Sequence, residues 1–118
     1  MRQPIAVFFA FKESLVLDLV TKEQLPEILQ SHKKVIIKFG ADWCSGCRAL
    51  APYLDKLQKD HPEVKFLEVN ADEESELVAQ YNVKNLPTLI SFVDGTKSDT
   101  LTGSGLGMKV LKDFVLKA

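Results

Sequence analysis

The sequence predicts an α/β fold with a central mixed β-sheet of about five strands flanked by about four helices, and three observations lead to this prediction. Residues 35–39 (VIIKF) form a nearly continuous apolar run of strand length, which is typical of a strand covered on both faces. Leucines at helical spacing follow this run, and a second strand pattern at residues 64–69 follows the leucines. This order predicts a right-handed crossover and a parallel pair, with residues 35–39 as the central strand. Later, Asp94-Gly95 joins two further strand patterns, and this dipeptide is favoured in the tight turn of a hairpin.

The elements ahead of the central strand follow from local patterns. Residues 15–20 (LVLDLV) have the length and branched content of a short strand. Thr21 is placed to cap a helix that runs to about Ser31. Pro26 falls in the first turn or two of this helix and shortens or bends it.

Three helices and a hairpin are expected behind the central strand. The first helix begins at the two cysteines and ends near Asp60, with a kink at Pro52. Asp72 is expected to cap the second helix. The hairpin joins Thr88–Val93 to a Thr/Ser-rich stretch that ends near Thr102. The apolar residues that indicate the three helices are, in order, Leu50, Leu54 and Leu57; Leu77, Val78 and Tyr81; and Leu111, Phe114 and Val115.

Length and composition limit the classes of function. A chain of 118 residues can form one domain with a conventional core, so it needs no disulfide or metal to fold. Its 15 basic and 16 acidic side chains give a net charge of −1, and no block of like charges stands out, so we expect no nucleic acid among its partners. The longest apolar run, residues 5–11, is far shorter than the roughly 20 residues that span a bilayer, so no membrane partner is expected either.

Residues 1–14 are predicted to be an appendage to a domain formed by residues 15–118. The appendage is an extra strand, a tether or a disordered segment. Arg2 ahead of the apolar run resembles the charged start of an export signal. However, Phe11, Lys12 and Glu13 stand where small residues should mark a cleavage site, so the resemblance to a signal is weak.

The only two cysteines, Cys44 and Cys47, lie three residues apart behind Trp43. A structural disulfide usually joins distant parts of a chain, because its stabilisation comes from closing a long loop in the unfolded state. Two intervening residues close almost no loop. The pair is therefore half of a metal site, a redox couple or a coincidence, and Cys-x-x-Cys beside a strand–helix–strand unit is typical of a redox motif.

A metal site is the weaker of these interpretations. A closed zinc site needs four ligands, and only His32, His61 or carboxylates could complete the cysteine pair. His61 precedes Pro62 at a predicted helix end, and His32 lies between predicted elements, so we expect both to be ordinary surface residues. We therefore expect no metal and no organic cofactor.

Several landmarks resemble one family when they are taken together. They are residues 43–48 (WCSGCR), Pro52 five residues after Cys47, residues 85–88 (NLPT) and Gly103 behind the hairpin. In these residues and their spacing the chain resembles the thioredoxin family over about residues 15–118. The resemblance implies a thioredoxin fold, a role in electron transport and cell redox homeostasis, and a redox-active disulfide between Cys44 and Cys47.

The chemistry of thiol-disulfide exchange explains why such a protein carries its cysteines at a helix start. Exchange needs a thiolate that attacks a disulfide sulfur and a second thiol that resolves the mixed disulfide. Two cysteines one helical turn apart supply both. Because a helix N-terminus is partly positive, it lowers the pKa of a thiol there. Cys44 is expected to be the exposed nucleophile, and Cys47, one turn deeper, the buried resolving thiol.

The resemblance also implies a groove for an extended peptide segment of a substrate protein. The backbone of one residue would pair with this segment, which is recognition by strand addition and reads backbone more than side chains. The proline of the groove would form a cis peptide bond and pack against the cysteines. The residues carried over are Trp43, Ser45 and Gly46 on one wall, Leu86 and the cis Pro87 at the pairing edge, and Gly103 with Ser104 on the other side.

Two departures from the usual family sequence lie close to the cysteines. Ser45-Gly46 replaces the usual Gly-Pro, so the helix start is less rigid and a serine hydroxyl can donate to a thiolate. Both changes favour the reduced form and predict a more oxidising protein than a typical member. Gly40 stands at a position that is usually aromatic, and Phe8, Phe9 or Phe11 of the appendage are candidates to fill the space.

A third departure concerns two charges. Lys38 stands where the family keeps a buried aspartate, and Glu68 stands where it keeps a nearby lysine. Because an unpaired charge in a core costs several kcal/mol, we expect Lys38 and Glu68 to pair beneath Cys47. There they would handle the proton of the resolving thiol. The alternative is that Lys38 extends to the surface.

We therefore predict a cytoplasmic, monomeric thiol-disulfide oxidoreductase that reduces protein disulfides generally. Its partners would be protein disulfide substrates and a thioredoxin reductase or similar electron donor. One alternative is a more oxidising thiol oxidase or disulfide isomerase in the periplasm or an organelle. A second is a thioredoxin-fold binding module whose cysteines are incidental.

Overall fold

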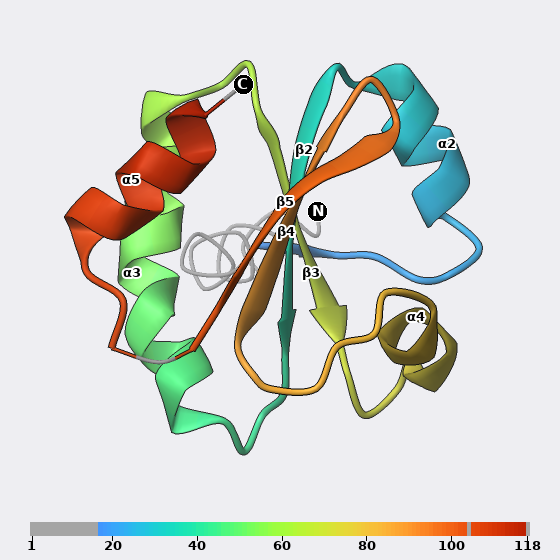
Figure 1. The fold of residues 1–118 in the computed structure, drawn as a ribbon, viewed down its shortest axis with the longest axis horizontal. Coiled ribbons are helices and arrows are strands. Elements are labelled where there is room, and N and C mark those ends of the chain that lie inside the picture. The colour runs from blue at the N-terminus through green and yellow to red at the C-terminus, as the bar shows by residue number, and fades with distance from the viewer. Residues whose placement is uncertain (1–16, 104, 118) are drawn as a thin grey trace, which may run out of the picture.

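The computed structural model describes residues 17–103 and 105–117, so the predicted appendage, the first two residues of the predicted strand 15–20 and Ser104 lie outside the described part. The described chain folds around a five-stranded sheet in the order β1-β3-β2-β4-β5 (Figure 1). β1, β3 and β2 are parallel, and β4 is antiparallel to β2 and β5. This sheet and its helices confirm the predicted fold class. The elements are β1 (Asp18–Leu19), α2 (Leu25–Ser31), β2 (Lys34–Gly40), α3 (Ser45–Asp60), β3 (Lys65–Asn70), α4 (Ser75–Gln80), β4 (Thr88–Val93), β5 (Thr96–Thr102) and α5 (Met108–Leu116).

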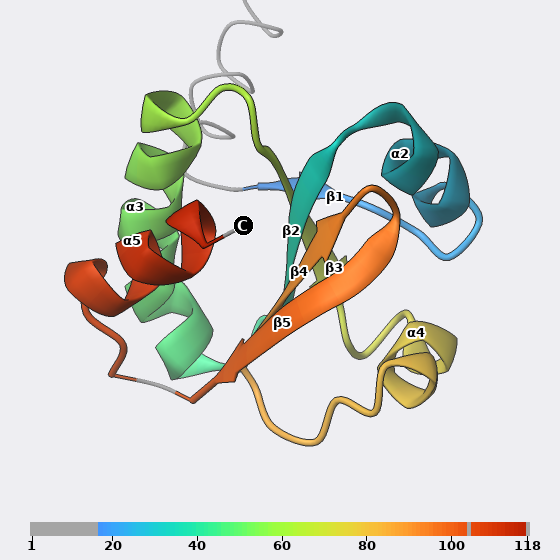
Figure 2. The ribbon, with the colours of Figure 1, turned by 45° about the horizontal axis from the view of Figure 1, so that its top comes forward.

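The helices cover the two faces of the sheet in pairs. α3 and α5 lie on one face, and α2 and α4 lie on the other (Figures 1 and 2). Each face has its own apolar cluster. Leu50, Leu54, Leu57, Leu111, Phe114 and Val115 pack on the first face, while Leu25 and Leu77 pack on the second.

β2 is the central strand, as the sequence predicted, and its residues from Val35 to Gly40 are all buried. Its side chains alternate between the two clusters, because successive residues of a strand point to opposite faces. Ile36 packs on the α3 side, whereas Ile37 packs on the α2 side. Lys38 and Gly40 share the face of Ile36 and therefore lie under α3.

α3 places the cysteines and confirms the helix predicted from them to Asp60. Cys44 is its N-cap residue, and Cys47 lies in its first turn. The buried side chains of the helix include Cys47, Leu50, Leu54 and Leu57, which recur at helical spacing and face the sheet. α3 thus begins a few residues after β2 ends at Gly40, so the cysteines lie at the C-terminal end of the central strand.

Of the two predicted helix caps, one forms and one does not. Thr21 caps the turn that leads into α2: the Gln24 backbone N–H donates to Thr21 Oγ1 at 3.4 Å, and the Thr21 backbone N–H donates to Gln24 Oε1 at 3.0 Å. The regular helix itself begins only at Leu25, with Pro26 in its first turn, where the missing backbone N–H of proline is tolerated. α4 begins at Ser75 with Glu74 as its N-cap residue, so Asp72 does not cap it. Instead, the backbone N–H of Asp72 donates to Asn70 Oδ1 at 2.9 Å, and a turn separates β3 from α4.

The hairpin at Asp94-Gly95 forms as predicted, and both residues have positive φ, 53° and 82°. We expect Gly95→Ala to lower the free energy of unfolding by about 1 kcal/mol, because a side chain disfavours this backbone conformation. Urea unfolding measures the change. Asp94→Asn is the control, since asparagine tolerates the left-handed region, and its effect should stay within about 0.5 kcal/mol. Equal effects of the two substitutions would contradict the argument.

Candidate active site

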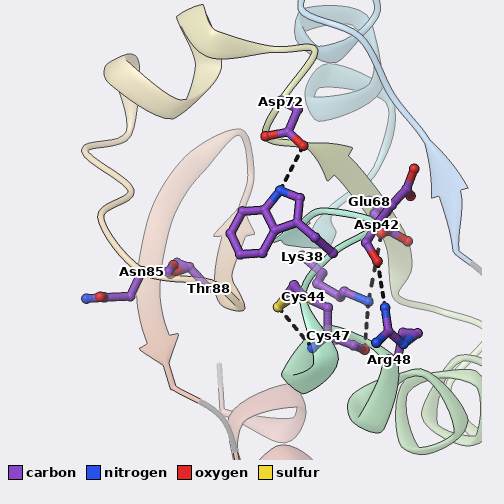
Figure 3. Close-up of a disulfide and its surroundings, with 10 residues drawn as sticks. Lys38, Asp42, Cys44, Cys47, Arg48, Glu68, Asp72, Asn85 and Thr88 are labelled. Atoms are coloured by element: carbon purple, nitrogen blue, oxygen red, sulfur yellow. Dashed lines mark hydrogen bonds and ion pairs between the residues drawn. A yellow bond between two sulfur atoms is a disulfide. The ribbon is translucent and has the colours of Figure 1, made fainter.

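The two cysteines form a disulfide at the N-terminus of α3 (Figure 3). Their Cα atoms lie 5.3 Å apart. The backbone N–H of Cys47 donates to Cys44 Sγ at 3.2 Å. A sulfur at this position thus receives both the partial positive charge of the helix end and a direct donor, and both stabilise a thiolate.

Both cysteines are buried in the disulfide form, as the sequence predicted for Cys47 but not for Cys44. Cys44 is 5% exposed and Cys47 is 2% exposed. Ala41 belongs to the same buried cluster, and Leu86 from the segment before β4 packs against it. Trp43, in contrast, is 67% exposed, so the indole and not the sulfur is the prominent surface feature here.

The exposed indole of Trp43 is held by a contact that sequence reasoning missed. Trp43 Nε1 donates to Asp72 Oδ2 at 2.9 Å. Asp72 lies in the turn behind β3, 29 residues along the chain. This bond limits the orientations open to the indole beside the disulfide.

A shallow groove borders the disulfide, and most of the residues predicted for it meet there. The peptide bond between Leu86 and Pro87 is cis. The backbone N–H of Gly103 donates to the carbonyl oxygen of Pro87 at 3.1 Å, which brings the end of β5 beside the proline. Ser104 lies outside the described residues. The groove is lined by Trp43, Cys44, Ser45, Gly46, Ala49, Leu86 and Gly105, of which Ala49 and Gly105 were not predicted.

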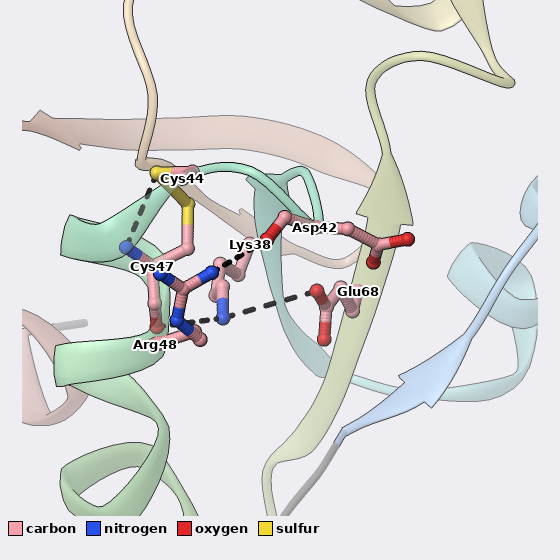
Figure 4. A network of polar contacts seen from close by, with 6 residues as sticks. All are labelled: Lys38, Asp42, Cys44, Cys47, Arg48 and Glu68. Atoms are coloured by element: carbon pink, nitrogen blue, oxygen red, sulfur yellow. Dashed lines mark hydrogen bonds and ion pairs between the residues drawn. A yellow bond between two sulfur atoms is a disulfide. The ribbon is translucent and has the colours of Figure 1, made fainter.

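Lys38 and Glu68 are neighbours beneath the disulfide (Figure 4). They are directly opposite each other on the parallel strands β2 and β3. Lys38 Nζ lies 3.8 Å from Glu68 Oε2, and it donates to the carbonyl oxygen of Cys47 at 3.2 Å. The side chains are 6% and 17% exposed, so Lys38 does not extend to the surface.

Burial opposes the charged form of both partners. It lowers the pKa of Lys38, and the attraction of Glu68 only partly offsets this effect. Burial likewise raises the pKa of Glu68; Lys38 lowers it, and the nearby carboxylate of Asp42 raises it further. The pair therefore lies in a poorly solvated environment close to Cys47.

A cavity of about 210 Å³ adjoins this pair and Cys47. Charged residues of both signs contribute to its wall. Arg48 Nη1 donates to the backbone oxygen of Asp42 at 2.6 Å and so fixes one part of this wall (Figure 4). The Lys38 side chain is part of the cavity wall and therefore borders open space.

A side chain at position 40 would come close to Lys38 and Cys47. A Cβ atom at Gly40 would lie 3.1 Å from Cys47 Sγ and 3.2 Å from Lys38 Cε. Phe8, Phe9 and Phe11, which the sequence suggested for this space, lie outside the described residues. Among the described residues, Lys38 and Cys47 are the ones that border this position.

In the described ranges 17–103 and 105–117, no three histidine, cysteine, aspartate or glutamate side chains gather in an arrangement that could hold a metal ion. His32 Nδ1 contacts the Ile28 carbonyl oxygen at 3.1 Å, and His61 Nδ1 lies 3.4 Å from Glu63 Oε2. No helix in this part of the chain has the length and apolar content to cross a bilayer.

Known proteins resemble the chain in sequence and in structure. The Thioredoxin family model matches residues 16–117. A thioredoxin of Mycoplasma genitalium is 32% identical over 100 residues, which are 85% of this chain and 98% of the relative. Thioredoxin 1 of Synechococcus elongatus is 38% identical over 79 residues, 66% of this chain and 74% of the relative. A solved thioredoxin structure from Plasmodium falciparum has a TM-score of 0.78 at 29% identity, and the match covers 84% of this chain and 96% of that one.

Proposed function

The chain belongs to the thioredoxin family of thiol-disulfide oxidoreductases, and from this premise we propose that it is a general reductant of protein disulfides that acts through Cys44 and Cys47. One observation supports the proposal most strongly. The cysteines form a disulfide at the N-terminus of α3, where the Cys47 N–H donates to Cys44 Sγ. This position favours a reactive thiolate on Cys44.

The reaction is two successive exchanges. In the reduced protein, the Cys44 thiolate attacks one sulfur of a substrate disulfide, and the other substrate sulfur leaves as a thiolate that takes up a proton. Cys47 then loses its proton and attacks Cys44 Sγ, and the second substrate thiol is released. Two electrons pass to the substrate, and Cys44–Cys47 becomes the disulfide that the structure contains.

The groove beside the disulfide would hold the substrate during both steps. An extended substrate segment would pair with the backbone of Leu86, next to the cis Pro87. Recognition through the backbone fits a broad choice of substrates. The walls would be Trp43, Ser45 and Gly46 on one side and Gly103 with Ser104 on the other, all within a domain formed by residues 15–118.

Lys38 and Glu68 would handle the proton of Cys47. Lys38 Nζ holds the carbonyl oxygen of Cys47 and faces Glu68 at the same time, so a proton leaving the thiol has a carboxylate or a neutral amine within one cavity. A positive charge at Lys38 would also stabilise thiolates and make the couple more oxidising. This effect favours the thiol oxidase or isomerase as the second candidate function.

The proposed partners follow from the family. Its members act on protein disulfides, and a thioredoxin reductase or similar donor would return the electrons to Cys44–Cys47. We place the protein in the cytoplasm as a monomer.

Insulin reduction tests the proposal. With a thioredoxin reductase as electron donor, the protein should reduce insulin over many turnovers, which is followed by precipitation of the insulin B chain. Its redox potential should lie nearer about −270 mV, as for thioredoxin, than about −120 mV, as for a strong thiol oxidant. A potential at the oxidising end would support the second candidate, and a dithiol that exchanges with no disulfide would leave only the binding module.

A further inference from the structure

Gly40 is the last residue of β2 and lies on the same strand face as Lys38, directly under Cys47. We infer that Gly40 is a positioning residue for Lys38: its missing side chain provides the space through which the lysine stem passes beneath the Cys47 sulfur. The inference rests on the proposed function, because it assigns Lys38 a place in the exchange reaction.

Gly40 is needed because it has no side chain, and not because its backbone conformation requires a glycine. Among the described residues, the glycines with positive φ are Gly95, Gly103 and Gly105, so Gly40 has a backbone that any residue can adopt. A Cβ atom at Gly40 would lie 3.1 Å from Cys47 Sγ, 3.5 Å from Cys47 Cβ and 3.2 Å from Lys38 Cε. Contacts of 3.1 and 3.2 Å are closer than the usual separation of about 3.5–4.0 Å between such atoms, so one neighbour must move.

Lys38 is the neighbour that can move. Cys47 lies in the first turn of α3, so the helix holds its backbone in both the disulfide and the dithiol form, and in the disulfide form its Sγ is also bonded to Cys44. Lys38 Cε, in contrast, is near the end of a flexible stem with an adjoining cavity of about 210 Å³. A methyl group at residue 40 should therefore leave β2 in place and push the ammonium group away from Cys47.

The displacement has a chemical consequence, because Lys38 Nζ now makes two contacts. It lies 3.2 Å from the Cys47 carbonyl oxygen and 3.8 Å from Glu68 Oε2. A cation moved away from Cys47 stabilises a thiolate there less, and the reduced form loses part of its advantage. Gly40 thus affects the redox equilibrium only through Lys38.

A double-mutant cycle tests this dependence. The equilibrium between the dithiol and glutathione disulfide, and the pH profile of insulin reduction, are measured for wild type, Gly40→Ala, Lys38→Ala and the double variant. Gly40→Ala should shift the equilibrium toward the Cys44–Cys47 disulfide by about threefold to tenfold, since tenfold corresponds to one pKa unit of a thiol. In the Lys38→Ala background the same substitution should change the equilibrium by less than about twofold.

Two outcomes of the equilibrium measurement overturn the inference. The first is a Gly40→Ala shift that persists undiminished without the Lys38 stem, because the methyl group would then act on Cys47 directly. The second is no shift at all in Gly40→Ala. In both cases insulin reduction by the wild-type protein still supports the proposed function, so the two failures are distinguishable.

Loss of stability needs its own control. Gly95→Ala destabilises the hairpin at the other end of the sheet and should leave the glutathione equilibrium unchanged. If Gly40→Ala alone fails to fold, the double variant with Lys38→Ala should fold, because removing the stem restores the space. Failure of the double variant as well, with Lys38→Ala alone folded, overturns the inference.

Discussion

Cys44→Ser should remove insulin reduction, with an expected loss of about 10³-fold or more, whereas Cys47→Ser should leave a protein that reacts once and remains bound to its substrate. Without the Cys44 thiolate no first attack occurs, and a serine hydroxyl at the same helix end does not replace it. Without Cys47 the mixed disulfide forms but has no internal thiol to resolve it. Mass spectrometry of each variant incubated with a disulfide substrate separates the two defects.

The control for this pair is the oxidation state of the wild-type protein after the same incubation. It should accumulate the Cys44–Cys47 disulfide and no lasting adduct. Multiple turnovers by Cys47→Ser, or an adduct on Cys44→Ser, would mean that the roles of the two cysteines are assigned in the wrong order.

Lys38→Met should lower the free energy of unfolding by about 3 kcal/mol near neutral pH, because it leaves the half-buried carboxylate of Glu68 without its partner. The second substitution in Lys38→Met/Glu68→Gln should recover most of the loss, since a neutral pair has no uncompensated charge. Urea unfolding of both variants measures the difference. Equal stability of Lys38→Met and wild type would show that the pair contributes nothing to the fold.

The loss of stability in Lys38→Met should also grow as the pH rises. Burial raises the pKa of Glu68 above its usual 4.5, and removing Lys38 takes away the attraction that lowers it. The folded protein then holds a proton more tightly than the unfolded chain, so stability falls as pH rises from about 4.5 through the folded pKa. The deficit relative to wild type should be smaller at about pH 5 than at about pH 8, and it should not have this pH dependence in Lys38→Met/Glu68→Gln.

The parts of the structure that local patterns determine were predictable. The apolar run of residues 35–39 identified the central strand, and the spacing of Leu50, Leu54 and Leu57 identified the helix that carries the cysteines. Lys38 and Glu68 could be placed together because both lie in strand patterns on either side of one crossover helix.

The features that the sequence did not predict depend on distant parts of the chain. Asp72 is a residue type that often caps helices. In the structure its backbone N–H donates to the side chain of Asn70 in a turn, and its carboxylate accepts a hydrogen bond from the indole of Trp43. Cys44 is covered by Leu86, which comes from a segment 42 residues later. The resemblance placed Leu86 in the groove beside the cysteines, but nothing in the residues around either contact indicated the Trp43–Asp72 bond or the burial of Cys44.

The strand order also bears on how the chain refolds. β4 and β5 pair through a tight turn, with Val93 opposite Thr96, whereas the parallel pairing of β1 with β3 joins Leu19 to Glu68. Hairpins form in about 1–10 μs, and pairings between distant residues are slower because their loops must close first. The antiparallel half of the sheet can therefore assemble early. The cysteines lie at the start of α3 between β2 and β3, so we expect this helix end to dock on the complete sheet only when the slower half assembles.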